Sequence, residues 1–264
     1  MTDLIRAEFI RLVTTRLWVW ALVAALGTGG LIGVLALVGP ENFDPPLPGL
    51  QTEEGARTLL GIAGFLVFIP ALIGATAVTS EFRHRTITPT FLASPRRGRV
   101  LIAKLITYAV AGAVYGITAA VFAGAGLYAG AAVHGVELGL SFGTIVGLLA
   151  RIAAAMIVYT VLGVGVGALL RSQVAAIAIL GAYLYLIESL LLLIPGVRTI
   201  YPYLPGGATA ALTNFTQLSK AVAEQTGSAA VQLVSAPVGV LLLAGYGIVA
   251  AVLAVAAPLR RDIA

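Results

Sequence analysis

Stretches of about twenty apolar residues recur along this chain of 264 residues and constrain its fold more than any other feature. A helix rises about 1.5 Å per residue, so about 20 apolar residues cross a hydrocarbon layer of about 30 Å. The sequence therefore predicts an all-α, polytopic membrane protein with six transmembrane helices. The expected spans are Leu17–Val38, Leu59–Thr79, Val100–Val121 with a continuation toward Ala129, Ile145–Leu170, Val174–Ile194 and Val238–Ala257.

Composition narrows the class further. Only 10% of the residues are charged and 59% are hydrophobic, whereas soluble domains are about 25% charged. Six spans occupy about half of the chain, so we expect one transmembrane domain over residues 1–264 and no separate soluble module. The chain has no cysteine, which excludes disulfides, thiolate catalysis and Cys-ligated metal centres.

Residues 1–16, before the first span, have an amphipathic pattern. Phe9 and Leu12 belong to an apolar helical stripe, and Arg6 and Arg11 lie away from it. A helix of this kind lies in the headgroup region of a membrane. We therefore expect an N-terminal interfacial helix.

The cations predict the orientation of the spans. Twelve of the 16 Lys and Arg residues fall on the side that holds the N-terminus, which the positive-inside rule assigns to the cytoplasm. Both termini are then cytoplasmic. The basic surplus suits anionic lipid, and we expect no nucleic-acid partner. The twelve are Arg6, Arg11, Arg16, Arg83, Arg85, Arg96, Arg97, Arg99, Lys104, Arg171, Arg260 and Arg261.

The outer segment 195–237 is moderately apolar but contains no complete span. It holds an aromatic and Pro/Gly-rich run at 201–207, followed by a helix-compatible run, Ala208–Glu224. Each half is too short or too polar to cross a bilayer. We expect re-entrant or interfacial helices here, before the last span.

The cytoplasmic connection 80–99 is the only long inner loop. Ser80 is expected to cap a short helix that Pro89 limits, with apolar residues such as Phe82 and Ile87 on one side. Such a helix is either a docking surface for a cytosolic partner or a basic loop that only sets topology. Glu81 favours docking, because the topology rule does not require an acid there. It could pair with a basic partner or brace the helix.

Several of these residues together resemble the permease subunits of ABC-2 type transporters. The resemblance covers the whole chain, from the amphipathic entry helix through six spans to the re-entrant character before the last. Its motifs are residues 6–12 (RAEFIRL), 14–16 (TTR), 80–83 (SEFR), 86–87 (TI), 94–97 (SPRR), Lys104 and 203–208 (YLPGGA).

The resemblance implies an ATP-driven exporter of a lipophilic or amphiphilic substrate, such as a drug or lipid, in a bacterial inner (plasma) membrane. ATP and Mg would bind a separate ATP-binding cassette subunit, and a second permease copy or a homologous chain would complete the pathway with 6+6 helices. The coupling helix that docks on the ATPase would fall on Glu81, Phe82, Arg83, His84, Arg85 and Thr86.

Catalytic motifs are missing from the sequence. There is no G-x-x-x-x-G-K-[ST] phosphate loop, no H-E-x-x-H and no G-x-S-x-G. We therefore expect no catalytic, cofactor or metal site on this chain, and ATP hydrolysis on the partner. His84 and His134 fall in loops and are expected to be solvated.

Glu188 is the one acid well inside an expected span. An intramembrane carboxylate is costly and often functional, so Glu188 is a possible substrate-pathway or proton-binding residue. Alternatively it lies near the outer interface, bonded to Tyr183, Tyr185 or Ser189, and tunes helix packing. A carrier that is driven by an ion gradient through Glu188 is thus an alternative function, and a non-transporting membrane anchor is another.

Glycines are spread through the spans at helical spacing, four residues apart in Gly29/Gly33, Gly112/Gly116, Gly126/Gly130 and Gly139/Gly143/Gly147, with a cluster at Gly163/Gly165/Gly167. Small residues at this spacing let helices approach closely in lipid. We expect most of them to serve packing within one subunit, with a flexible point at 163–167 as the alternative.

Overall fold

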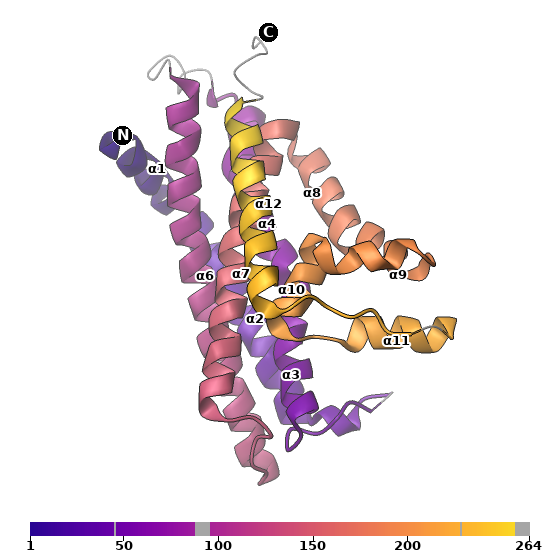
Figure 1. Ribbon diagram of the computed structural model, residues 1–264. Coiled ribbons are helices and arrows are strands. Elements are labelled where there is room, and N and C mark those ends of the chain that lie inside the picture. The colour runs from indigo at the N-terminus through magenta and orange to yellow at the C-terminus, as the bar shows by residue number, and fades with distance from the viewer. Residues whose placement is uncertain (45, 88–95, 228, 257–264) are drawn as a thin grey trace.

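The computed structural model describes residues 1–44, 46–87, 96–227 and 229–256 (Figure 1). The chain is 83% helical, and the described residues contain no strand. Within the described residues, six helical stretches are long and apolar enough to cross a membrane. The predicted all-α, polytopic fold is confirmed, and the protein is a multi-pass membrane protein.

The six spans agree with the predicted ones to within a few residues at most ends. The second is broken by a 3₁₀ turn, and the fifth contains a π-helical stretch. They are α2 (Leu17–Val38), α3–η2–α4 (Glu53–Ile62, Ala63–Val67, Phe68–Arg83), α6 (Arg97–His134), α7 (Phe142–Leu170), α8–η3–α9 (Gln173–Gly181, Ala182–Ile187, Glu188–Leu193) and α12 (Ala236–Ala256).

The third span is longer than predicted. Helix α6 has 38 residues, about 57 Å at 1.5 Å per residue, and α7 has 29. Both exceed a hydrocarbon layer of about 30 Å. In Figure 1 the lower parts of α6 and α7 extend past the end of α12.

Helix α1 (Thr2–Thr14) precedes the first span and packs against α6. The chain turns between α1 and α2 at Arg16, which has a left-handed φ of 57°. Leu12 of α1 is buried, whereas Phe9 is 45% exposed. The helix thus keeps apolar surface available on the outside of the bundle, as the amphipathic pattern predicts (Figure 1).

Close backbone packing explains most of the spaced glycines. A Cβ on Gly33 of α2 would lie 3.1 Å from Cα of Gly126 in α6, and one on Gly116 of α6 would lie 2.7 Å from the carbonyl oxygen of Ala153 in α7. Gly167 of α7 meets the backbone of Ala75 in the same way. These contacts confirm packing within the subunit.

Two glycine expectations need correction. Gly139 lies outside the spans, in the turn between α6 and α7, where it meets the backbone of Thr52 and Glu53. Gly143 and Gly147 face open space, so these two make no close helix contact within the chain.

The outer segment forms three short helices rather than two halves. They are η4 (Val197–Tyr203), α10 (Pro205–Thr213) and α11 (Gln217–Thr226). The run Ala208–Glu224 was expected to be one helix, but Asn214 adopts a left-handed φ of 54° and ends α10. Nearly all of α10 is buried, whereas α9 and α11 project to one side of the bundle (Figure 1).

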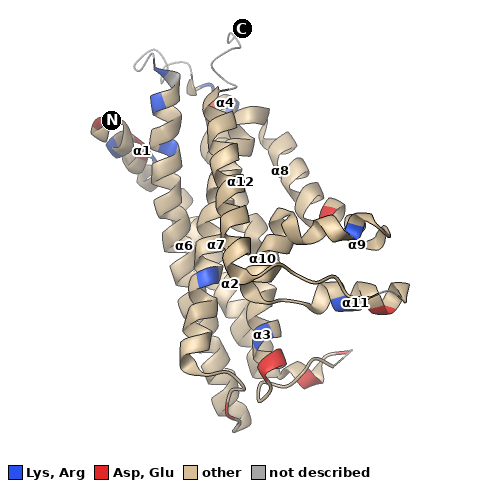
Figure 2. Ribbon diagram, in the orientation of Figure 1, with Lys and Arg blue, Asp and Glu red and all other residues tan. Residues whose placement is uncertain are grey.

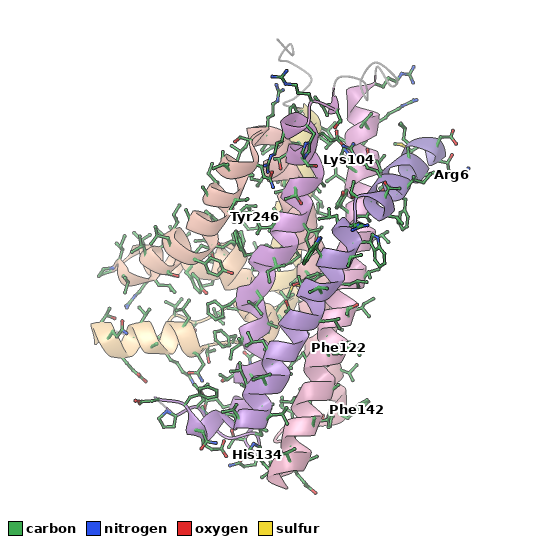
Figure 3. All side chains as sticks on the ribbon, turned by 180° about the vertical axis from the view of Figure 1, so that it is seen from behind. Arg6, Lys104, Phe122, His134, Phe142 and Tyr246 are labelled. Carbon is green, nitrogen blue, oxygen red and sulfur yellow. The ribbon has the colours of Figure 1, made fainter. Side chains whose placement is uncertain are left out.

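The two ends of the bundle differ in charge. We call the end that carries α1, the end of α4 and the start of α6 the α1 end. Most Lys and Arg lie there, whereas most Asp and Glu lie toward the opposite end (Figure 2). Figure 3 labels Lys104 near the α1 end and His134 at the opposite end of the same helix. Arg260, Arg261 and Pro89 lie outside the described residues.

Candidate functional site

The first candidate site is a buried ion cluster at the α1 end. Glu81, near the end of α4, has no exposed surface. Its Oε1 accepts hydrogen bonds from Nζ of Lys104 on α6 and from Nη1 of Arg11 on α1. One carboxylate therefore joins three helices that are distant in sequence.

Two further groups complete this cluster. Lys104, 2% exposed, also donates to Oε2 of Glu8 over 2.7 Å. Arg11 donates through Nη2 to the hydroxyl of Thr86 over 3.2 Å. The ion cluster, defined as Glu8, Arg11, Glu81 and Lys104, thus contains two acids and two bases. Burying these charges is tolerable because each has a partner.

The structure places Glu81 on the inside of the chain. Of the two roles that the sequence left open for it, bracing is the one that the contacts show, since both its cationic partners belong to the same chain. Its side chain offers no surface to a second protein in this conformation.

The other predicted docking residues lie around Glu81. Phe82 is half-buried, with the guanidinium carbon of Arg171 5.7 Å from its ring centroid. Arg83 is exposed and donates through Nη1 to Oε1 of Gln173 over 3.0 Å. His84, Arg85 and Thr86 are also exposed. We call Arg83, His84, Arg85 and Thr86 the basic turn.

The secondary structure that precedes the basic turn differs from the prediction. Ser80 was expected to cap a new helix, but it lies inside α4, which continues to Arg83. The helix then ends in a Schellman motif, in which the Thr86 N–H donates to the Glu81 carbonyl over 2.9 Å and the Arg85 N–H to the Phe82 carbonyl over 3.3 Å. The rest of the 80–99 loop, residues 88–95, lies outside the described residues.

The second candidate site surrounds Glu188, the first residue of α9. This residue is only 2% exposed. Oε2 accepts a hydrogen bond of 2.8 Å from the backbone N–H of Gly206, in the first turn of α10. The positive end of a helix is a favourable place for a carboxylate. Oε1 has no hydrogen-bond partner among the described residues.

Gly206 is required for this approach. A Cβ at that position would overlap Oε2 of Glu188 and lie 3.0 Å from its Cδ. Glycine therefore leaves the space that the carboxylate occupies. This contact replaces the predicted bonds to Tyr185 and Ser189, since Tyr185 donates instead to the carbonyl of Phe65 over 2.5 Å. Tyr183 lies close to the carboxylate, as predicted.

A cavity of about 50 Å³ lies beside Glu188. That volume holds a few waters or one small polar group. Its lining contains no Lys, Arg or His and combines Glu188 with aromatic and hydroxyl side chains. The lining includes Phe65, Tyr159, Tyr185, Ser189, Tyr201, Gly206, Thr209, Thr213 and Phe215.

Several hydroxyl groups of the lining are hydrogen-bonded to each other or to backbone carbonyls. Tyr159 and Thr209 share a hydrogen bond of 3.0 Å, and Thr209 donates to the carbonyl of Pro205 over 2.9 Å. Burial, reinforced by the Glu188 carboxylate, raises the pKa of the Tyr201 phenol, so this group keeps its proton. The cavity wall is thus fixed, neutral and aromatic, with one acid.

Sequence reasoning missed the partners of both acids. Lys104 is the single lysine at the start of a span and lies at the same membrane side as Glu81, which was an available signal. Gly206 belongs to the 203–208 motif, but nothing in the sequence indicated that it meets Glu188. His134 is exposed, as expected, but it is the last residue of α6 and does not lie in a loop, and its Nε2 lies 3.1 Å from the carbonyl oxygen of Leu37. The described residues contain no group of three metal-ligating side chains.

No protein-family model matches this chain, and no curated protein matches it.

Proposed function

We propose that this chain is the permease subunit of an ATP-driven ABC-2 type exporter, in which it forms half of the pathway for a lipophilic or amphiphilic substrate. The observation that carries the proposal is the basic turn, an exposed cationic surface fixed directly to the ion cluster. A docking surface must transmit force, and this one is attached to three helices through buried charges.

The partner in this proposal is a separate ATP-binding cassette subunit that holds ATP and Mg. Movement of a docked ATPase would displace the basic turn, and Glu81 would carry that displacement to Lys104 on α6 and Arg11 on α1. In this chain α6 packs on α2 and α7, and α4 packs on α7. The rearrangement would therefore reach the spans that surround the substrate pathway.

The proposal also includes the arrangement in the membrane. The excess of Lys and Arg at the α1 end supports a cytoplasmic location for both termini in a bacterial plasma membrane. A second copy of this chain, or a homologous one, would complete the pathway.

Association with an ATPase provides the test. The neighbouring reading frames should include an ATPase with a phosphate loop, and that protein is the probe. Charge reversal at the basic turn, R83E with R85E, should reduce co-purification of the ATPase with this chain at least about tenfold. The acidic surface of the ATPase that receives the cationic turn in this proposal would then face a turn of the same charge. R198E, which reverses a cation in η4 toward the opposite end, is the matched control. Undiminished association of the double variant contradicts the docking assignment.

A carrier driven by an ion gradient is the second candidate function. It is favoured by one observation, the unpaired Oε1 of buried Glu188. E188Q separates the two functions, because a proton-coupled carrier loses pH-driven transport while an ATP-driven exporter keeps vanadate-sensitive transport. A non-transporting membrane anchor predicts that no ATPase co-purifies at all.

A further inference from the structure

The cavity beside Glu188 has the chemistry of a cation site. Its one charged group is a carboxylate whose Oε1 lacks a partner among the described residues. The other buried acids among the described residues, Glu8 and Glu81, are both paired with Lys104, although Oε2 of Glu81 also lacks a hydrogen-bond partner. An unpaired buried carboxylate is costly, and a ligand cation would supply the missing charge and hydrogen bond.

Aromatic rings make up much of the remaining wall. Phe65, Tyr159, Tyr185, Tyr201 and Phe215 all line the cavity. Phe65 and Phe215 pack edge to face, with centroids 5.2 Å apart and an angle of 87°. Aromatic rings together with a carboxylate are the usual surroundings of a bound ammonium group, because the ring faces attract a cation.

Size and access limit what the ligand can be. A volume of about 50 Å³ admits a primary ammonium group but not a drug-sized molecule, which needs about 300 Å³ or more. Phe65 and Tyr185 are 38% and 44% exposed, so the rim belongs to the apolar outer surface of η2 and η3. A ligand that places its head in the cavity would leave its tail on this apolar surface.

We propose that the Glu188 cavity binds the ammonium head of a cationic amphiphile, with the Glu188 carboxylate as its ionic partner and the aromatic lining around it. The transported substrates would then be single-tailed amines, and this statement about transport rests on the proposed function. Binding itself requires neither an ATPase nor turnover.

Equilibrium binding of radiolabelled dodecylammonium to the purified full chain in detergent tests the proposal. At pH 8 we expect saturable binding that excess unlabelled dodecylammonium displaces and dodecanol does not. E188Q keeps the acceptor for the Gly206 N–H and should weaken binding at least about tenfold. E137Q removes an exposed acid from the turn between α6 and α7 and should bind like the wild type.

A second variant covers the case in which E188Q fails to fold. G206A keeps the charge but moves the carboxylate, because its Cβ would overlap Oε2, and it should also weaken binding. Each variant is first compared with the wild type by size-exclusion elution. Equal affinity in E188Q and wild type, equal competition by dodecanol, or no saturable binding overturns the proposal.

The result is separable from the proposed function. A chain that binds dodecylammonium through Glu188 but co-purifies with no ATPase would contradict the exporter and retain this site. A chain that co-purifies with an ATPase but shows no Glu188-dependent binding would do the reverse.

Discussion

Glu81 and Glu188 are both almost completely buried in helices of the membrane domain, yet their surroundings are opposite. Glu81 has two cations on one oxygen, from α1 and α6. Glu188 has one backbone N–H on Oε2, no hydrogen-bond partner for Oε1 among the described residues, and a cavity without a cation beside the side chain. The same side chain is compensated at one end of the bundle and uncompensated toward the other.

The difference separates two uses of a buried charge. A compensated carboxylate holds helices together, and removing one partner leaves the others without compensation. An uncompensated carboxylate does not hold helices together. In a membrane domain such a residue is usually functional, because it binds a ligand or an ion. The two acids therefore predict opposite responses to substitution.

The largest effect is expected from removing the cation of the ion cluster. K104M leaves Glu81 with Arg11 alone and Glu8 without its cationic partner, and it should lower the free energy of unfolding by about 3–5 kcal/mol. Equilibrium unfolding in mixed micelles with increasing SDS measures this. The double variant E81M/K104M, which removes one acid with the base, should recover most of the loss. A K104M protein as stable as wild type would show that the cluster does not brace the bundle.

A smaller effect is expected where Glu188 meets α10. G206A forces the carboxylate or the helix to shift, which should cost about 1–3 kcal/mol in the same unfolding measurement. G245A is the control, because a Cβ there has nothing within 4 Å and alanine favours a helix interior. If G206A and G245A are equally stable, the close contact between Gly206 and Glu188 is not maintained.

E188Q tests the prediction for Glu188, the uncompensated acid. Because an unpaired buried carboxylate is costly, neutralising Glu188 should not lower the free energy of unfolding and should raise it by about 1–3 kcal/mol in the absence of ligand. The measurement is the one used for K104M, so the two values compare directly. A loss as large as that of K104M would mean that Glu188 is compensated after all.

The smallest effect concerns the turn that follows Glu81. Arg85 has a φ of 56°, a conformation that glycine adopts without the penalty that a Cβ brings. R85G should therefore stabilise the chain by up to about 1 kcal/mol, as a rise in the thermal unfolding midpoint would show. A lower midpoint would indicate that the Arg85 side chain itself holds the turn.

The spans could be predicted because their physical cause is local. The first span was expected at Leu17–Val38 and is found there, since Arg16 on one side and Gly39–Pro40 on the other both end an apolar run. The break at Asn214 and the continuation of α4 through Ser80 were not predicted. Both depend on contacts with other segments, which override weak local signals.

The two sites differ in how far the sequence indicated them. Glu188 and the Glu81–Thr86 stretch stood out as polar residues in or beside apolar runs. Their partners did not, because Arg11, Lys104 and Gly206 are separated from them by 70, 23 and 18 residues. Only the packing of the helices brings them together.

The π-helical stretch η3 ends directly before Glu188. A π-helical turn contains one residue more than an α-helical turn, and each residue of an α-helix advances the side-chain direction by about 100°. Deleting one residue between Ala182 and Ile187 would keep α9 helical but aim position 188 at a different neighbour. The angular phase of a single turn thus decides whether this chain presents its unpaired acid to the cavity or to the surrounding lipid.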